Sequence, residues 1–332
     1  MYREVHKMRH IITGGNGFTG KVLANHLLNI KEEVIIFDTH NYSSNDIYSK
    51  ARQVIGDVRV TNDLKKLEIK PNDVVYHLAA RQFADSVPRQ GRDAWFEDVN
   101  VTGTRNVMQA MQEAGARKLV FFSTDMTYGR PDVCPIPPDY PQKPLGPYGR
   151  SKLKAELIIR NAEGITPTIF RPRLITGYGR LGILGKLFRL IRKGLPVPMI
   201  GSGHNRYQMV SVEDCARAAI LAVQKGCPPG PFNLGSENPP TTRELLKGIV
   251  DHAGSRSILV PTPAAPLKLL LGLLDRSGLT LLYPEQFGIA DADILLDTNS
   301  TRRELGWTPA IDDIDMMNAA YDAFLATEKL NS

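Results

Sequence analysis

Cysteine is scarce in this chain. Its 332 residues include three, Cys134, Cys215 and Cys227, which cannot all pair, and none stands in a C-x-x-C or mixed Cys/His spacing that would hold a metal. The sequence therefore predicts neither a disulfide framework nor a metal site, and we expect a reducing compartment. Residues 1–10 contain no apolar segment of the kind that signal peptides have, so the cytoplasm is the expected location.

Long apolar runs are also missing. The most apolar stretch, residues 267–282, is interrupted by Lys268, Asp275 and Arg276, and no run reaches the roughly 20 residues that span a bilayer. We expect no membrane-spanning helix. A lobe-packing helix is the favoured interpretation of this stretch, and a hydrophobic substrate wall or a membrane-surface contact are the alternatives.

Charge of one sign is in small excess. The 41 Lys and Arg residues against 35 Asp and Glu leave a net charge of +6, which predicts weak attraction for anionic ligands. The basic residues are scattered, whereas a nucleic-acid footprint would gather them or interleave them with aromatic residues. We therefore expect no nucleic-acid partner.

Strand-like runs alternate with helical patterns through the first half of the chain. Amphipathic helices are expected at residues 21–28 and 103–114, and short apolar strands at residues 11–12, 33–37, 54–55, 73–76 and 118–122. Strands that are apolar almost throughout belong to parallel sheets covered by helices on both faces. The sequence therefore predicts an α/β fold with a doubly wound parallel sheet of the Rossmann type.

The texture changes near residue 177, where glycine and proline become dense. We predict a dinucleotide-binding domain over residues 1–176, to which some later segments return. A second, smaller mixed α/β substrate lobe is expected to consist mainly of residues 177–332.

A glycine cluster follows the first predicted strand and leads directly into a helix. Glycine lets the backbone approach a pyrophosphate closely, and the helix N-terminus presents free N–H groups. Asp38 follows Gly20 by 18 residues, at the end of the second strand, where its carboxylate can bind both ribose hydroxyls and would repel a 2′-phosphate. These features favour NAD over NADP; a tight turn with a solvated Asp is the alternative. The predicted cofactor contacts here are Gly14, Gly17, Phe18, Thr19, Gly20 and Asp38.

Tyr148 and Lys152 open another predicted helix, and their spacing places them one turn apart on the same face. A neighbouring ammonium and a nicotinamide cation would both lower the pKa of the phenol toward neutrality, which would make Tyr148 a general acid and base. Such pairs also occur by chance on helix surfaces. Here the pair follows the cofactor turn on the same sheet, and a strand upstream delivers Ser123, Thr124 and Asp125 to the sheet edge.

With these residues the chain resembles the extended short-chain dehydrogenase/reductase family over nearly its whole length. The matching segments are residues 13–20, 56–58, 77–80, 100–104, 123–129, 148–152 and 305–309. The resemblance implies a catalytic triad of Thr124, Tyr148 and Lys152.

It also implies further cofactor contacts at Asp57, Val58, Leu78, Ala79, Ala80, Asn100 and Pro172. Asp57 and Val58 would flank the adenine, the two alanines would line the groove, and residues 172–175 would close over the nicotinamide end. The alternatives are helix caps at Asp57 and Asn100 and simple packing of the alanines.

Within this family the chain looks most like nucleotide-sugar epimerases and dehydratases, which use NAD. A 4-epimerase needs only the triad, whereas a 4,6-dehydratase uses a Thr-Asp-Glu run. Here the run is Thr124, Asp125 and Met126, and a thioether cannot move a proton. Dehydration is therefore disfavoured.

Two departures concern the substrate. Leu174 stands where sugar-nucleotide enzymes usually carry Asn, so the segment looks more like the 3β-hydroxysteroid dehydrogenase branch. The Arg that usually clamps a diphosphate is replaced in direct register by Tyr207, and Arg206 or Arg173 would have to substitute. The predicted substrate contacts are Ser123, Asp125, Arg173, Arg206 and Tyr207.

The expected function is epimerisation of a secondary alcohol on a nucleotide-linked sugar through a transient keto intermediate. The alternatives are a net dehydrogenase or ketoreductase of a hydrophobic or sterol-like alcohol, and a catalytically silent dinucleotide sensor. The family likeness also suggests a homodimer through the helices around Gln109 and Leu157.

Overall fold

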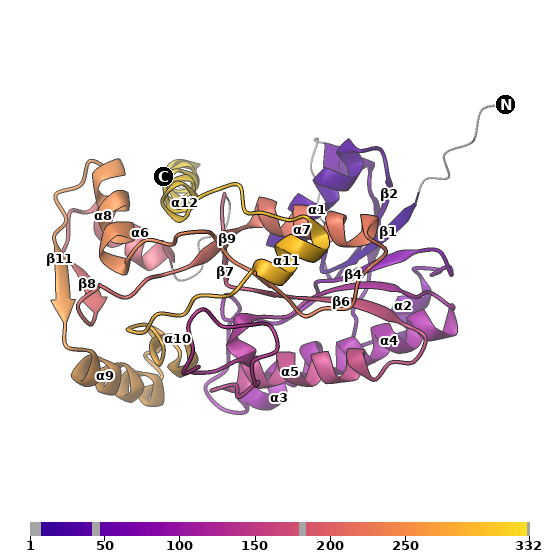
Figure 1. Ribbon diagram of the computed structural model, residues 1–332, viewed down its shortest axis with the longest axis horizontal. Coiled ribbons are helices and arrows are strands. Elements are labelled where there is room, and N and C mark those ends of the chain that lie inside the picture. The colour runs from indigo at the N-terminus through magenta and orange to yellow at the C-terminus, as the bar shows by residue number, and fades with distance from the viewer. Residues whose placement is uncertain (1–7, 42–46, 179–183, 331–332) are drawn as a thin grey trace.

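A seven-stranded parallel sheet forms the centre of the larger half of the molecule (Figure 1). The structure is a computed structural model, which describes residues 8–41, 47–178 and 184–330. The strands lie in the order β10-β6-β5-β4-β1-β2-β3. Their bounds are β1 (Arg9–Thr13), β2 (Glu33–Asp38), β3 (Arg52–Ile55), β4 (Val74–His77), β5 (Lys118–Phe122), β6 (Thr166–Pro172) and β10 (Phe232–Leu234). The predicted doubly wound parallel sheet is confirmed.

Each strand predicted from the first half of the sequence is present. The apolar runs form β1 to β5, and every residue of β1 and β4 is buried. Burial on both faces explains why apolar residues stand side by side in these strands instead of alternating with exposed polar ones. Because all the strand pairs of this sheet are parallel, their carboxyl ends lie at one edge, where ligands of such folds bind.

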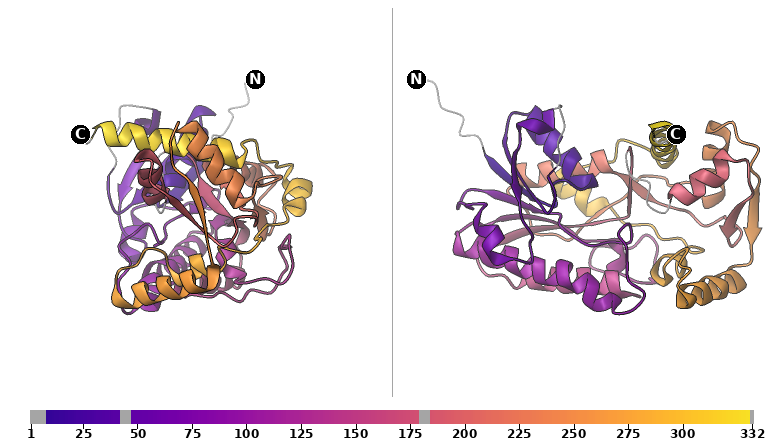
Figure 2. Two further views of the ribbon diagram at one scale, coloured as in Figure 1. Left: turned by 90° about the vertical axis from the view of Figure 1, so that its left-hand side faces the viewer. Right: turned by 180° about the vertical axis from the view of Figure 1, so that it is seen from behind.

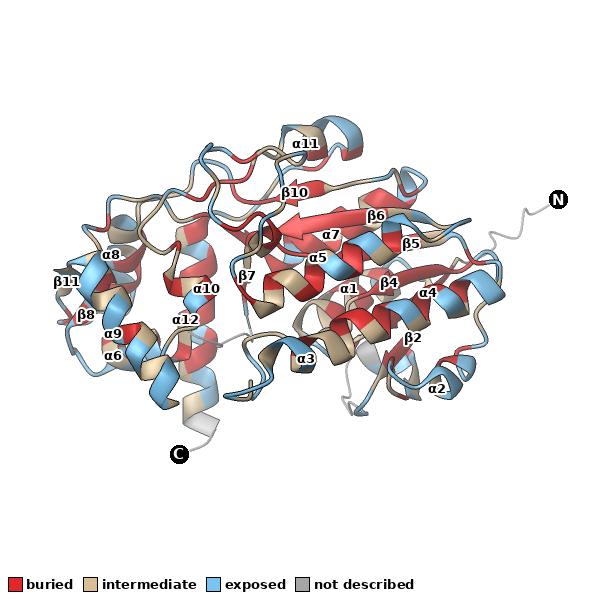
Figure 3. Cartoon of the chain, turned by 90° about the horizontal axis from the view of Figure 1, so that it is seen from below, coloured by how far each residue is buried: buried red, intermediate tan, exposed pale blue. Residues whose placement is uncertain are grey.

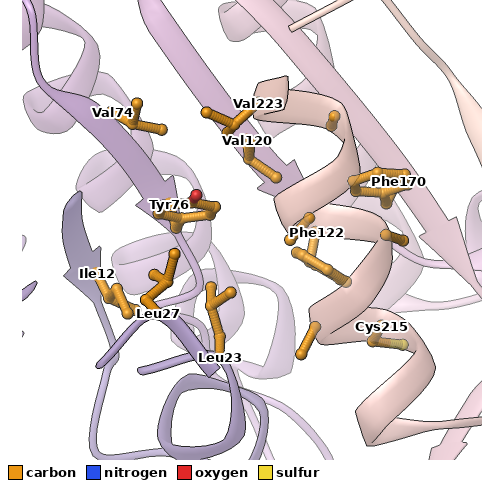
Figure 4. Close-up of a cluster of buried hydrophobic side chains, with 14 of the residues drawn as sticks. Ile12, Leu23, Leu27, Val74, Tyr76, Val120, Phe122, Phe170, Cys215 and Val223 are labelled. Carbon is orange, nitrogen blue, oxygen red and sulfur yellow. The ribbon is translucent and has the colours of Figure 1, made fainter. Parts of the chain in front are cut away.

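Helices cover both faces of the sheet. On one face α1 (Phe18–Asn29) and α7 (Val212–Gln224) bury Leu23, Leu27 and Cys215 against the strands (Figure 4). On the other face lie α2 (Thr61–Lys65), α3 (Arg92–Glu97), α4 (Thr104–Glu113) and α5 (Pro147–Arg160), whose buried sides face the sheet (Figure 3). Gln109 and Leu157 are exposed on α4 and α5, and the homodimer expected through these helices stays a prediction.

A smaller lobe lies beyond the carboxyl edge of the sheet (Figure 2). Its core lies between α6 (Leu184–Arg192), α8 (Thr242–His252) and α12 (Asp313–Leu330). Two small parallel sheets pair β8 (Val197–Ile200) with β11 (Leu259–Thr262) and β7 (Leu174–Thr176) with β9 (Met209–Ser211). The other α-helices of the described residues are α9 (Ala264–Ser277), α10 (Pro284–Phe287) and α11 (Asn299–Leu305).

Later parts of the chain return to the main sheet. β10 pairs with β6, α7 packs against α1, and α11 lies beside β10. The chain therefore crosses between the two halves more than once after residue 177, and the boundary placed there stays a prediction. Among the described residues no helix is long and apolar enough to cross a membrane.

Candidate active site

Glycines in the turn between β1 and α1 allow close contacts between backbone segments. Gly14 has φ +69°, and a Cβ there would lie 2.6 Å from the backbone nitrogen of Ala79. A Cβ on Gly20 would lie equally close to the carbonyl oxygen of Gly14. Gly17 is the N-cap of α1, without a side-chain cap, and Phe18 and Thr19 form the first turn, which has no acidic residue. This terminus fits a pyrophosphate, because its N–H groups and dipole favour an anion.

Asp38 lies beside this turn, at the end of β2. Its carboxylate accepts hydrogen bonds from the backbone N–H groups of Asn16, at 2.9 Å, and Thr39, at 2.8 Å. These bonds fix its position at the carboxyl edge of the sheet, where the spacing in the sequence predicted it. The arrangement of the turn and the carboxylate fits a dinucleotide with a free 2′-hydroxyl.

The loop after β4 is fixed by a buried histidine. The ring of His77 is hydrogen-bonded to the hydroxyls of Thr13, at 2.7 Å, and Thr104, at 3.0 Å. Burial, together with the nearby Lys152, lowers the pKa of His77 to about 3, so the ring is neutral and links three elements. Leu78, Ala79 and Ala80 follow directly, and the backbone of Ala79 contacts the glycine turn.

Asn100 connects this loop to α5 and is not the helix cap considered as an alternative. It lies in a π-helical segment, Asp98–Gly103. Its side chain accepts from the backbone N–H of Arg81 at 2.8 Å and donates to the Arg81 carbonyl and the Ser151 hydroxyl. The Ser151 hydroxyl in turn donates to the carbonyl of Tyr148. Asn100 thereby positions two parts of the candidate site.

Asp57 and Val58 lie at the start of the β3–α2 connection. Arg59 binds the Asp57 carboxylate at 2.6 Å and holds its pKa below the usual range. Val58 is buried, and a Cβ on Gly103 would lie 2.6 Å from it. These contacts are structural, and the predicted adenine contact of both residues stays a prediction.

A cavity of about 480 Å³ separates the carboxyl edge of the sheet from the small lobe. It brings together seven of the predicted site residues, from β5, α5, β6 and the small lobe: Ser123, Thr124, Asp125, Tyr148, Pro172, Arg173 and Tyr207. The opposite wall is largely apolar and includes Leu281, Leu282 and Ile289.

Tyr148 lies in the first turn of α5 and lines this cavity. Its ring packs edge-on against Phe83, with centroids 5.3 Å apart, and also contacts Phe96. One turn further, Lys152 is buried, with Nζ 4.1 Å from the centroid of the Phe121 ring. Burial lowers the pKa of Lys152 to about 7, so near neutral pH it exchanges between a cation and a neutral amine.

The loop after β5 supplies a hydroxyl and an ion pair. Thr124 donates from its hydroxyl to Asp125 at 3.3 Å. The other Asp125 oxygen lies 2.8 Å from Nη1 of Arg173, and both side chains are buried. Burial lowers the pKa of Arg173, but Asp125 and Tyr207 outweigh burial and keep it above its ordinary value. The guanidinium lies over the Tyr207 ring, 5.2 Å from its centroid.

Arg206 is placed differently from what the sequence suggested. It is exposed, its guanidinium lies 3.6 Å from the Asp293 carboxylate, and the cavity lining includes its neighbour Tyr207 instead. Both residues lie in extended backbone, where neighbouring side chains point to opposite sides. Arg173 is therefore the better placed of the two candidate arginines.

Three residues that sequence reasoning missed come from the distant small lobe. Glu285 is buried, and its carboxylate accepts from the backbone N–H groups of Tyr148 and Gly149, at 3.0 and 3.1 Å. Burial raises its pKa, although these bonds oppose the rise. Tyr283 stacks on Phe83 with centroids 4.5 Å apart, and Lys186 of α6 lines the cavity. No local sequence motif predicts that any of them lies at the site.

A buried ion pair supports α5 from behind. Nε and Nη2 of Arg171 bind both carboxylate oxygens of Glu156, at 3.0 and 2.7 Å. Burial opposes ionisation of Glu156, but Arg171 keeps its pKa below the usual value. Arg171 also donates to the Tyr128 hydroxyl, which donates to Asn233. This network joins α5, β6 and β10.

The fold, the glycine turn and the Tyr-Lys pair agree with a family model that matches residues 10–235. The chain belongs to the NAD dependent epimerase/dehydratase family, and it is an enzyme that is similar to nucleotide-sugar epimerases. Expectations of fold and family from the sequence are thereby confirmed.

Curated relatives share about a quarter to a third of their residues with this chain. Protein y4nG of Sinorhizobium fredii is 30% identical over 322 residues, which cover 95% of this chain and 78% of the relative. The UDP-glucose 4-epimerase of Mycolicibacterium smegmatis is 29% identical over 92% of this chain and 94% of its own.

Solved structures agree with the fold. Bordetella bronchiseptica WbmG, in complex with NAD and UDP, has a TM-score of 0.77 at 22% identity, covering 98% of this chain and 96% of WbmG. The UDP-glucose 4-epimerase of Thermotoga maritima, with UDP-glucose, has a TM-score of 0.76 at 23% identity, covering 97% and 100%.

Proposed function

We propose that this enzyme epimerises a secondary alcohol on a nucleotide-linked sugar, with NAD as its cofactor. The observation that carries the proposal is the convergence of Thr124 and Tyr148 on one cavity, with Lys152 buried one turn behind the phenol. The neutral His77 and the Asn100 bridge hold the surrounding loops in place. UDP-glucose 4-epimerases among the relatives support the substrate class.

In the proposed reaction Tyr148 takes the proton from the substrate hydroxyl and later returns it. The cationic form of Lys152 favours the phenolate that this transfer requires. The Thr124 hydroxyl bridges the substrate oxygen and the phenol. NAD, held by the glycine turn and Asp38, would supply the hydride acceptor, which becomes the donor in the return step.

Two features of the cavity limit the reaction. Met126 lines it where a dehydratase needs an acid, and the Asp125 carboxylate is held by Arg173. Epimerisation needs no acid at these two positions, because the enzyme keeps the hydride and returns it to the opposite face of the sugar. Epimerisation is therefore favoured over elimination of water.

The apolar wall at Leu281, Leu282 and Ile289 favours a second candidate, net oxidation of a hydrophobic alcohol. The two candidates differ in how they treat the cofactor. An epimerase restores its cofactor in each cycle and can keep it bound, whereas a net dehydrogenase must exchange it.

A thermal-shift screen with NAD and a panel of UDP-, dTDP- and GDP-sugars, together with a sterol-like alcohol, tests the proposal. A ligand at 100 times its dissociation constant stabilises the fold by about 2.7 kcal/mol. We expect a nucleotide sugar to give the largest shift and NAD to remain bound through purification. Stabilisation by the sterol-like alcohol alone, with turnover that depends strictly on added NAD, would favour the second candidate and overturn the first.

A further inference from the structure

The orientation of α9 is the reverse of what a surface helix usually shows. Two of its three charged residues, Lys268 and Asp275, face the protein, whereas Arg276 is exposed. Nζ of Lys268 contacts the Asp291 carboxylate and donates to the carbonyl of Gly288. Asp275 accepts two hydrogen bonds of 2.8 Å from Arg92. In an ordinary surface helix the charged side chains face water and the apolar ones face the core.

Three of the six leucines of α9 point outward, whereas Leu271 is buried. Leu269 is 67% exposed, and Leu270 and Leu273 are each 52% exposed. The chain then turns at Gly278, and Leu279 and Leu281 extend the same kind of surface, 63% and 51% exposed. We call these five residues the leucine face. Helix α9 lies at the outer end of the small lobe (Figures 1 and 3). Several exposed leucines within one short segment mark a site of contact with a partner or a membrane.

Basic residues lie at the Gly278–Leu281 end of the leucine face. Arg276 is exposed in the last turn of α9, and Arg89 donates to the carbonyl of Gly278 at 3.4 Å. Lys186, also exposed, donates to the carbonyl of Leu281 at 3.5 Å. The acidic residues that contact this segment, Asp275 and Asp291, are already held in ion pairs with Arg92 and Lys268. Among the described residues, the charge at this end of the face is therefore cationic.

This charge distribution indicates which partner would bind the leucine face. In a two-fold dimer through the leucine face, the same cations of both copies would be brought together, and like charges at close range are unfavourable. Anionic headgroups would instead pair with the cations while the leucines enter the boundary between headgroups and acyl chains.

We propose that the leucine face docks this enzyme on a bilayer surface that carries anionic lipids. Leu281 belongs both to this face and to the cavity wall, so the docked enzyme presents its substrate cavity beside the membrane. The proposal concerns where the enzyme acts and does not depend on which alcohol it oxidises.

The test is co-sedimentation of the full chain with vesicles of phosphatidylcholine and phosphatidylglycerol in equal parts. We expect binding that weakens with salt and is much weaker on phosphatidylcholine alone. The triple variant Leu269→Ser/Leu270→Ser/Leu273→Ser removes the centre of the face, and about a tenfold loss of binding per leucine is expected from the apolar surface withdrawn. Arg276→Glu should weaken binding about fivefold or more, and only at low salt.

The matched control is Ile30→Ser/Ile55→Ser/Val60→Ser, because these residues are 54%, 55% and 46% exposed on the far half of the molecule. It should bind vesicles as the unchanged enzyme does. Absence of binding to anionic vesicles at low salt would overturn the proposal, and so would equal losses in the two triple variants. A dimer that the leucine variant abolishes, without vesicle binding, would assign the face to a second copy.

Discussion

Glu285 accepts a hydrogen bond of 3.0 Å from the backbone N–H of Tyr148, across 137 positions of the sequence. A second bond, of 3.1 Å, comes from Gly149. The N-cap of α5 is Gly146, which has no side chain to offer, so a carboxylate from the small lobe caps the helix instead. A residue of the small lobe thereby holds the backbone of Tyr148, the residue that we propose transfers the proton.

Removing this cap should affect turnover more than binding. We expect Glu285→Ala to destabilise the fold by about 1 kcal/mol, as lost caps do, and to lower kcat about tenfold with little change in KM, because the phenol is no longer held in place. Steady-state kinetics and denaturation measure both effects.

The control is Glu244→Ala, which breaks the exposed capping box of α8 with Thr241 in the small lobe. It should show a similar loss of stability with kcat unchanged. Equal loss of kcat in the two variants would mean that Glu285 acts through stability alone.

Protonation of the buried Lys152 should lower the free energy of unfolding near neutral pH. Its pKa is lowered to about 7 by burial, against about 10.4 in an unfolded chain. Between these values the unfolded chain binds a proton that the folded chain does not, so stability falls as pH decreases through this window, and the cost is complete below it.

Lys152→Met should therefore raise the unfolding free energy of the ligand-free protein at neutral pH by roughly 2–4 kcal/mol, with no gain above the unfolded pKa, and should abolish turnover. Denaturation at several pH values checks this. Lys154→Met, on the exposed side of the same helix, should show no such pH-dependent gain. A stability difference for Lys152→Met that is the same at all pH values would contradict the account.

Asp38 should set the choice between NAD and NADP. In Asp38→Asn the repulsion of a 2′-phosphate is removed and one ribose acceptor is lost. We expect NAD affinity to fall about tenfold and NADP affinity to rise. Calorimetric titration of both cofactors measures the ratio. The control Asp63→Asn removes a carboxylate of α2 and should leave the ratio of NAD to NADP affinity unaltered. An unchanged ratio in Asp38→Asn would count against the predicted role of Asp38.

The buried pair of Glu156 and Arg171 predicts a large loss of stability when one partner is removed. Glu156→Gln leaves the Arg171 charge buried without its counter-ion, which should lower the unfolding free energy by about 3–5 kcal/mol. The double variant Glu156→Gln/Arg171→Met should recover part of this loss, since no unpaired charge remains. Additive losses in the double variant, measured by denaturation, would contradict this interpretation.

The sequence predicted the parts of the site that lie within single βα units. Strands, the glycine turn and the position of Asp38 follow from short-range patterns, because a parallel sheet fixes where each strand ends. The same reasoning placed Thr124 and Tyr148 at one edge, where the structure has both on the cavity wall.

Contacts between distant segments could not be read in this way. Glu285, Tyr283 and Lys186 reach the site through the packing of the small lobe, which has no repeating pattern. Register alone could not decide between Arg206 and Arg173, since the side of the chain on which a residue points depends on neighbouring strands. For residues 267–282 composition favoured a lobe-packing helix, whereas α9 buries Leu271 and exposes Leu269, Leu270 and Leu273.

The central claim is that the Tyr148 phenol takes the proton when the substrate carbon gives up its hydride. Turnover of Tyr148→Phe, with the nucleotide sugar that gives the largest thermal shift, tests it most directly. We predict a rate lowered by roughly 10²–10⁴, with the thermal shifts from NAD and from that sugar unchanged. A Tyr148→Phe enzyme that turns over at nearly the original rate would contradict the claim.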